Sequence, residues 1–543
     1  MFWVAPSIRD GGIDSPRPAS QRAAAFILTA AMLITLAAPA FAETWYIENG
    51  DITVKAGETG NDVTQNNVTT KNDTDTIITN QKTDTASSNT VTIDAENDKV
   101  EVKLDNVNIK ADSGSALTSK GDVTLALNGD NHLTGGISGT GNYGRNGIAS
   151  TGSLTISGGE NDSLTAQGGS GADGSYGGHG IYSNGSLTIS GGTVNATGGD
   201  GSNVNGSGIS SNGSVTISGG TVTANGGSGK DGSGDGIFSF DPVAISGGTV
   251  TAKGGSGEDG EDGGDGIRSF DPVAISGGTV TAKGGSGEDG SGGRGIISTK
   301  SVTISGGTVN ANGGSGKNGN GGSGIIGSGR VAVSGGTVNA AGGDGGNGKD
   351  GGDGIYSSDI DLSGSLELTA KAGSPNGKAL SQKGSELVLD TIKDKLGPGA
   401  KVTATDADGK VIDQVPTPRP VEPEGPVIPE ESSSSSDGGS ATPSAPASPL
   451  PGLTVTDKSG AVIDSISTQS GNTLTVCVGR FTASFRISLA ALRQLRAEGI
   501  EAITFQTILC STTLSVDELL AMGGEDAEAV LTHRFTDSSL TVG

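Results

Sequence analysis

Residues 214–224 read Ser-Val-Thr-Ile-Ser-Gly-Gly-Thr-Val-Thr-Ala, and variants of this stretch recur from Leu154 to Leu362. The last apolar residue before each Ser-Gly-Gly or its equivalent marks one repeat, and successive marks lie 33, 28, 28, 30, 29, 29 and 29 residues apart. A period of this length is typical of a solenoid in which each repeat forms one coil. The marks are Ile156, Ile189, Ile217, Ile245, Ile275, Ile304, Val333 and Leu362.

Alternation within one repeat predicts strands. Val215 and Ile217 are apolar at every second position, as are Val222 and Ala224, which indicates short strands with one buried face. The two glycines between them allow the backbone to turn a corner. Ile209 supplies a third inward position. We therefore predict an all-β chain built on a right-handed parallel β-helix, with three short strands and three corners per coil.

Composition supports a thin core and restricts the partners. Of 543 residues, 32% are apolar and only 3% aromatic, too few large side chains for a conventional globular core of this size. A collagen triple helix is excluded because glycine does not occupy every third position. The net charge of −26 argues against a nucleic acid or an anionic membrane as partner. An acidic ligand would need a bridging divalent cation.

The first 42 residues have the pattern of a secretory signal peptide. Arg17 and Arg22 precede an apolar run from Ala23 to Leu36, and small residues follow as far as Ala42. This pattern predicts cleavage before Glu43 and a protein that is secreted or held at the cell surface. The alternative, a retained membrane anchor, requires a longer apolar run than this one.

Beyond the signal peptide the sequence divides into three parts. Residues 43–415 form the β-helix, whose less regular strands before about Asn131 predict an amino-terminal cap and the first coils. Residues 416–451 are rich in proline and serine and predict an extended linker. Residues 452–543 predict a small α+β domain, which its place after a linker makes a candidate for attachment or for docking a cell-wall or protein partner.

Alternation and capping residues outline that carboxy-terminal domain. Residues 474–478 and 481–487 alternate as the two strands of a hairpin. Ser488 and Ser515 are each placed to cap a helix, and further strands follow at 500–509, 529–533 and 539–542. Cys477 and Cys510 lie in predicted strands, where export permits a disulfide; two buried thiols are the alternative.

Four stretches in the amino-terminal part resemble one known family. They are Trp-Tyr-Ile-Glu-Asn-Gly-Asp-Ile-Thr-Val at 45–54, Val-Lys-Leu-Asp-Asn-Val-Asn-Ile at 102–109, Asp-Val-Thr-Leu-Ala-Leu-Asn-Gly-Asp-Asn at 122–131 and Gly-Ser-Leu-Thr-Ile at 152–156. In this order they resemble the secreted carbohydrate-binding-domain proteins of clostridia-like Firmicutes, over about residues 45–390. The resemblance implies a β-helix of pectate-lyase-like shape that binds acidic plant polysaccharide, with calcium, without cutting it. The glycine- and aspartate-rich inserts depart from the family pattern.

Those inserts are the first candidate site. Carboxylates and glycine carbonyls are oxygen ligands that calcium prefers. The spacing matches neither an EF-hand nor a nonapeptide calcium repeat, and such loops are also ordinary soluble turns. The candidate calcium ligands are Asp231, Asp235, Glu258, Asp259, Glu261, Asp262, Asp265, Asp350 and Asp353.

Aromatic residues form the second candidate site. Aligning the repeats places Tyr182, Phe238 and Tyr356 in one column, with Arg268 as another member. Phe240 and Phe270 occupy the neighbouring column one coil apart, so their rings should stack about 4.8 Å apart. Exposed rings in a row would suit the apolar faces of sugars. In the alternative, the Phe pair forms an internal ladder that packs a corner.

Lysines close two of the repeats, and no residue is singled out for catalysis. Lys253 and Lys283 are candidates to bind the carboxylates of a uronate chain, although such lysines also simply solubilise a sheet face. The three histidines are scattered and indicate neither a zinc site nor a hydrolytic triad. We therefore expect a non-catalytic polysaccharide-binding protein. A pectate-lyase-like enzyme and a structural surface stalk or adhesin are the alternatives.

Overall fold

The computed structural model describes residues 43–415 and 452–543, apart from short gaps at 139–142, 172–174, 204, 231, 457–461, 464, 471, 479–482, 508–510, 525–526, 535–536 and 543. The chain divides into two compact units, Met1–Glu424 and Gly425–Gly543, and each is described by itself. The predicted signal peptide and linker lie outside the described residues. Within the described ranges, the helices are all too short or too polar to cross a membrane.

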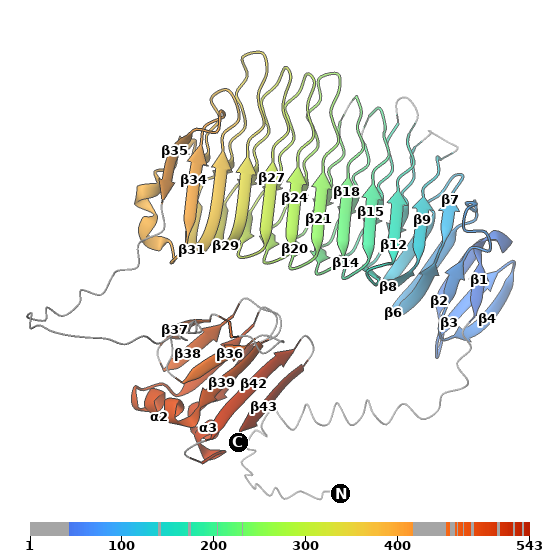
Figure 1. Cartoon of the computed structure of the whole chain (residues 1–543). Helices are drawn as coiled ribbons and strands as arrows, with labels where there is room; N and C mark the ends of the chain where they lie inside the picture. Colours follow the sequence, from blue (N-terminus) through green and yellow to red (C-terminus); the bar gives the residue numbers. More distant parts are fainter. Residues whose placement is uncertain are drawn as a thin grey trace, which may run out of the picture. The chain divides into compact units, whose positions relative to one another are not determined.

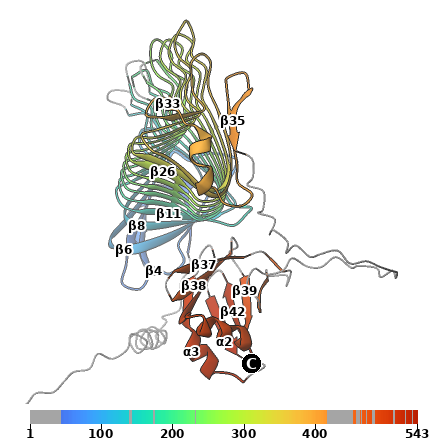
Figure 2. The same cartoon turned by 90° about the vertical axis from the view of Figure 1, so that its left-hand side faces the viewer.

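The first unit is a parallel β-solenoid of about 14 turns, seen from the side in Figure 1 and turned by 90° in Figure 2. Each regular coil contributes one strand to each of three sheets. The first sheet contains β10 (Ile148–Ser150), β13 (Ile181–Ser183), β16 (Ile209–Ser211), β19 (Ile237–Ser239), β22 (Ile267–Ser269), β25 (Ile296–Ser298), β28 (Ile325–Gly327), β30 (Ile355–Ser357) and β32 (Leu380–Gln382).

The second and third sheets follow in chain order. The second contains β11 (Leu154–Ser157), β14 (Leu187–Ile189), β17 (Val215–Ile217), β20 (Val243–Ile245), β23 (Val273–Ile275) and β26 (Ser301–Ile304). The third contains β9 (Asp130–Thr134), β12 (Ser163–Gln167), β15 (Thr193–Thr197), β18 (Thr221–Asn225), β21 (Thr249–Lys253), β24 (Thr279–Lys283), β27 (Thr308–Asn312) and β34 (Lys401–Thr405). In two late coils a single bent strand serves both sheets: β29 (Arg330–Ala341) and β31 (Ile360–Lys371).

The predicted period is confirmed residue by residue. Ile217 pairs with Ile245, and Ile245 with Ile275; the same pairing links every mark from Ile156 to Leu362. The period does not extend unchanged to the preceding coil: counting 29 residues back from Ile156 gives Leu127, but Ile156 lies beside Leu125. Both leucines point inward, so a slip of two residues keeps the same side buried and the pattern alone cannot choose between them.

The core is a stack of small aliphatic side chains. Ile245, Val250 and Ala252 are at most 1% exposed, and their equivalents in the neighbouring coils lie directly above and below them. Each buried Val or Ile contributes roughly 1.5–3 kcal/mol relative to an exposed one. A solenoid therefore gains a continuous core without aromatic residues, which explains the low aromatic content.

A buried column of serines holds the corner between the first two sheets. Ser239 donates a hydrogen bond to the carbonyl of Gly213 in the preceding coil, and Ser269 donates to that of Asp241, each at 2.9 Å. Both serines are fully buried. Because a buried carbonyl without a partner is costly, this column fixes the corner in every coil that carries it.

The third corner differs from the prediction, because it extends into two long arms. We call these segments, residues 254–266 and 284–295 among them, the glycine crest; they rise beyond the strands in Figure 1. Gly264 donates to the carbonyl of Gly255 in its own coil, and Gly285 donates to that of Gly264 from the next coil. The same zigzag of glycine hydrogen bonds continues through Gly293, Gly314, Gly322, Gly343, Gly352 and Gly373.

Glycine is required there because the arms touch backbone to backbone. A Cβ added to Gly285 would lie 1.7 Å from the carbonyl oxygen of Gly255, and one added to Gly264 would lie 2.1 Å from that of Gly234. No side chain fits in that space. Close backbone packing therefore explains the glycines along the arms, whereas Gly260 and Gly348 have a positive φ and nothing within 4 Å of an added Cβ, as expected of glycines in open turns.

Both ends of the solenoid are capped. At the amino-terminal end β2 (Ile52–Ala56), β3 (Asn61–Gln65) and β4 (Val68–Asp73) pair antiparallel; β3 and β4 were not predicted. The remaining elements of that end are β1 (Thr44–Tyr46), η1 (Ile47–Asn49), β5 (Ile77–Thr79), β6 (Val91–Asp105), β7 (Asn108–Lys110) and β8 (Leu117–Asn128). The other end carries β33 (Ser385–Glu386), η2 (Leu389–Thr391), η3 (Lys393–Lys395) and β35 (Val411–Val415), which pairs antiparallel with β34.

Over its described residues, the second unit contains two four-stranded sheets and two helices. One sheet consists of β36 (Leu453–Thr456), β39 (Ala483–Ser488), β42 (Glu528–Arg534) and β43 (Asp537–Val542), and the other of β37 (Ile466–Ser470), β38 (Thr473–Cys477), β40 (Ala502–Gln506) and β41 (Ser511–Ser515). The predicted hairpin is wrong: β38 and β39 belong to different sheets, because β38 pairs with the unpredicted β37. The predicted caps are confirmed, since Ser488 and Ser515 accept hydrogen bonds at the starts of α2 (Leu489–Ala497) and α3 (Val516–Ala521).

Candidate functional site

The most distinct surface feature of the solenoid is an exposed aromatic cluster at the end of β19 and β22. Phe240 and Phe270 stack with ring centroids 5.2 Å apart and an interplanar angle of 12°, which confirms the predicted stacking. Their side chains remain 48% and 36% exposed. The internal-ladder alternative is therefore wrong: the rings lie on the outside of the corner, where a ligand can reach them.

Two further side chains complete this cluster. Phe238 meets Phe240 and Phe270 edge-on, with centroids 5.0 and 5.9 Å apart. The guanidinium carbon of Arg268 lies 5.5 Å from the centre of the Phe270 ring. We call Phe238, Phe240, Phe270 and Arg268 the aromatic patch. It combines flat apolar faces with one cation, on strands that the coil pairing holds rigid.

The two tyrosines share the predicted column but lie away from the patch. Tyr182 is two coils from Phe238 and its hydroxyl accepts a hydrogen bond from Asn212 at 2.9 Å. Tyr356 is 40% exposed and is four coils from Phe238 in the other direction. The alignment of the repeats is therefore confirmed, but the structure brings together only the Phe residues and Arg268.

The two lysines lie on a different sheet from the aromatic patch. Lys253 and Lys283 are exposed neighbours at the ends of β21 and β24. A Cβ on Gly236, which directly precedes β19, would lie 2.5 Å from the backbone nitrogen of Lys253, so the lysines lie near the start of β19. Phe240 follows the other end of that strand. The two sets therefore lie towards opposite ends of β19.

The candidate calcium ligands are dispersed through the glycine crest. Asp259 lies 3.8 Å from Lys230, Asp262 accepts a hydrogen bond from the backbone of Ser291, and Asp350 accepts one from Asn376. Glu258 and Glu261 are exposed beside Asp259. Asp231 lies outside the described residues. Over the described part of the chain, the structure contains no group of three His, Cys, Asp or Glu side chains that could hold a metal ion.

Three of those aspartates have a different role that the sequence analysis missed. Asp235, Asp265 and Asp353 each stand two residues before the first strand of a coil, and each accepts a hydrogen bond from the backbone of its equivalent in the next coil, at 2.7, 2.7 and 2.8 Å. The sequence signal that could have revealed this role is position: each of these residues directly precedes a Gly-Ile pair or its equivalent. This polar column consists of Asn146, His179, Ser207, Asp235, Asp265, Arg294, Ser323, Asp353 and Lys378.

Burial shifts the protonation of this column. Burial and the neighbouring Asp265 carboxylate raise the pKa of Asp235 to about 7. Burial also raises the pKa of Asp265, opposed by the guanidinium groups of Arg294 and Arg268, each 3.7 Å away. Burial lowers the pKa of His179 to about 4. Burial therefore favours the neutral forms of Asp235 and His179.

We expect the stability of the solenoid to fall as pH rises, because of Asp235. Its raised pKa means that the folded state keeps a proton which the unfolded chain releases above about pH 4, so stability is lost between about pH 4 and about pH 7. Asp235→Asn, which preserves the hydrogen bond from the Asp265 backbone, should raise stability near pH 8 by an amount on the order of 2 kcal/mol. Thermal melting of the wild type and of the variant near pH 5 and near pH 8 measures this difference in stability.

The control is Asp353→Asn, which removes a carboxylate from the same column beside Lys378. Asp235 faces Asp265, Arg268 and Arg294, and none of these is altered in either variant. If the wild type and Asp235→Asn lose the same stability between the two pH values, the buried carboxyl is not the cause.

The structure contains another aromatic pair that the sequence analysis missed. Tyr143 and Tyr176, 41% and 47% exposed, lie on successive arms of the glycine crest with ring centroids 5.4 Å apart. Their interplanar angle of 34° makes them a less regular surface than the Phe pair. Since the inserts vary in length, the alignment of repeats gave no sign of this contact.

The predicted disulfide stays a prediction. Cys477 ends β38, beside Gln506 of β40, whereas Cys510 lies outside the described residues. Mass analysis without reduction distinguishes the disulfide from two thiols.

No protein-family model, no curated protein and no solved structure matches this chain. The candidate surfaces therefore have to be interpreted from their own geometry and chemistry.

Proposed function

We propose that this protein is an exported, non-catalytic polysaccharide-binding β-solenoid and that the glycan lies on the aromatic patch. The observation that supports this proposal is the parallel stacking of Phe240 and Phe270 with both rings partly exposed. A polymer of sugars repeats its apolar ring faces, and a row of aromatic rings at the coil spacing offers matching surfaces. Coil pairing holds the rings in place before binding, which lowers the entropic cost of association.

Polar groups beside the rings suit a glycan with carboxylates. Arg268 supplies a cation over the Phe270 ring, and guanidinium groups bind carboxylates in a fixed geometry. Asp241 and Asp271 directly follow the two phenylalanines and are acceptors for sugar hydroxyls or for a bridging cation. We therefore propose an acidic polysaccharide such as polygalacturonate as the ligand, with calcium offsetting the charge of −26 on the chain.

Affinity electrophoresis of residues 43–543 through gels containing polygalacturonate tests this proposal. We expect retardation by polygalacturonate, none by a gel without glycan, and a weaker effect after a chelator is added. Release of unsaturated uronide, followed by its ultraviolet absorbance, would support the pectate-lyase-like alternative. Absence of retardation in every buffer would leave the surface stalk or adhesin.

A further inference from the structure

A hollow lies where the third sheet meets the first arms of the glycine crest. It has a volume of about 680 Å³ and opens over the ends of β7, β9 and β12. That volume is in the range of pockets that hold small ligands, about 300–1,000 Å³. The hollow is on the sheet that carries Lys253 and Lys283, away from the aromatic patch, so it is a separate surface.

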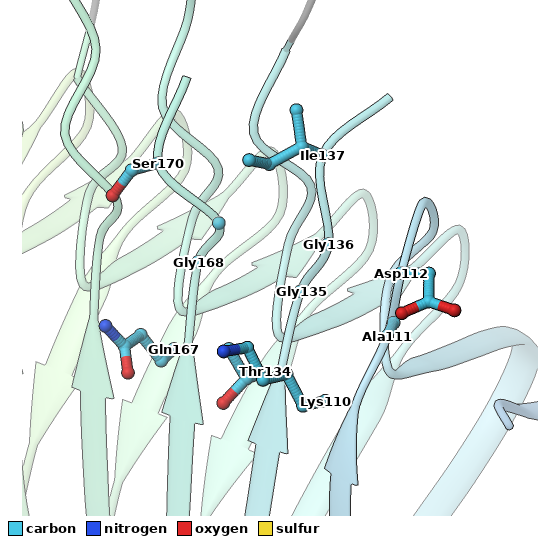
Figure 3. A pocket seen from close by; sticks show the side chains of 11 residues that line it. Lys110, Ala111, Asp112, Thr134, Gly135, Gly136, Ile137, Gln167, Gly168 and Ser170 are labelled. Carbon is cyan, nitrogen blue, oxygen red and sulfur yellow. The ribbon is translucent and has the colours of Figure 1, made fainter. Parts of the chain in front are cut away.

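Three polar side chains line its lower edge in a row. Lys110, Thr134 and Gln167 are register partners on consecutive coils, and Figure 3 shows them side by side where the strands end. They present an ammonium donor, a hydroxyl and a carboxamide. Neighbouring strands place them about 4.8 Å apart, so one small ligand can reach all three.

The upper part of the hollow adds an apolar and an acidic side chain. Ile137 is 45% exposed and lies on a crest arm above the row, and Asp112 lies beyond Lys110 (Figure 3). The charges of Lys110 and Asp112 cancel within the lining. A cation would meet the ammonium group of Lys110, and an anion would meet the carboxylate of Asp112, so the lining favours a ligand without net charge.

Glycines leave the backbone of the hollow bare. A Cβ on Gly135 would lie 2.1 Å from the carbonyl oxygen of Arg145, and one on Gly168 would lie 1.9 Å from that of Gly178. These glycines are therefore required by the packing between crest arms. As a result, the wall between the polar row and Ile137 carries no side chains that would obstruct a ring.

We propose that this hollow binds one neutral sugar unit, free or at the end of a glycan chain. Sugar hydroxyls both donate and accept hydrogen bonds, which matches the mixed donors and acceptors of Lys110, Thr134, Gln167 and Asp112. One apolar ring face packs on Ile137. This site is independent of the aromatic patch and its acidic ligand.

Saturation-transfer NMR of residues 43–543 with cellotriose, maltotriose or trigalacturonate tests the site. We expect transfer to at least one neutral trisaccharide and a roughly tenfold loss of affinity in the Thr134→Ala/Gln167→Ala variant, since two hydrogen bonds are removed. The matched control is Thr197→Ala/Asn225→Ala, which makes similar changes at the next two positions of the same column. It should bind like the wild type.

Three results would overturn this inference: no transfer to either neutral trisaccharide, equal losses in the two double variants, or a preference for trigalacturonate that the hollow variant abolishes. Its failure is distinguishable from that of the proposed function. Loss of polygalacturonate retention on replacing Phe240 and Phe270 concerns the aromatic patch alone, and it leaves binding of the neutral trisaccharide unchanged.

Discussion

Replacing Gly285 by alanine is expected to lower the free energy of unfolding of the solenoid by roughly 3 kcal/mol or more. The new Cβ would lie 1.7 Å from the carbonyl oxygen of Gly255 and 2.5 Å from its carbonyl carbon. The neighbouring arm is also backbone, so no flexible side chain can move aside. The arms must separate, and the hydrogen bonds from Gly285 to Gly264 and from Gly293 to Gly285 weaken. Denaturant unfolding followed by circular dichroism measures this loss.

Gly114→Ala is the matched control for that experiment. A Cβ at Gly114 meets nothing within 4 Å, and its φ is outside the positive range, as is that of Gly285. The two substitutions therefore differ in the contact that the methyl group makes. Equal stabilities of the Gly285 variant and the wild type would show that the crest arms do not pack as described.

Replacing both Phe240 and Phe270 by alanine is expected to weaken polygalacturonate binding at least tenfold. Both apolar platforms are lost, and each aromatic contact contributes roughly 0.5–1.5 kcal/mol beyond the buried area. The fold should remain, because the two rings are 48% and 36% exposed and are not part of the buried core. Titration calorimetry with oligogalacturonate measures the affinity, and thermal melting checks the fold.

Phe240→Tyr/Phe270→Tyr is the control that keeps both rings. It should retain most of the affinity, because the stacking faces are preserved. Unchanged binding in the alanine variant would remove the aromatic patch from the proposed function. Unfolding of that variant would show that the pair is mainly structural.

The solenoid could be predicted from sequence because one buried position recurs in every coil. Ile217, Ile245 and Ile275 stack on one another. The apolar residues at every second position beside them form the buried face of each strand. The period did not identify the partner of Ile156 in the preceding coil, because Leu125 and Leu127 both point inward and either would keep the same face buried. The strand pairing predicted for the second unit was wrong for a related reason. The sequence of β37 does not alternate between apolar and polar residues, so this strand was not predicted and β38 was assigned the wrong partner.

The glycine crest could not be predicted, because its contacts are between backbones. The sequence period was found from side chains that recur at the same position of each repeat. Gly255, Gly264 and Gly285 have no side chain, so their contacts leave no such pattern. The polar column escaped notice because its members differ: an aspartate, an arginine and a serine accept or donate at the same place in different coils. They share only their place before each Gly-Ile or equivalent pair, and hydrogen bonds between coils, such as that from the Asp265 backbone to Asp235, join them into one feature.

The candidate site was predicted in part. Aligning the repeats placed Phe240 and Phe270 one coil apart and predicted their stacking, but the sequence alone could not decide whether the rings face inward or outward. Lys253 and Lys283 were predicted separately from the aromatic residues, as candidates that close two of the repeats. They lie on another sheet, since the third strand of a coil runs back towards the crest.

Oxidative footprinting of the wild-type chain with and without polygalacturonate tests the central claim most directly. Hydroxyl radicals modify exposed phenylalanines, so a glycan that lies on the aromatic patch must protect the peptides that carry Phe240 and Phe270. We expect protection there and none at Lys253 and Lys283. Equal oxidation of both phenylalanines with saturating glycan would contradict the proposed site.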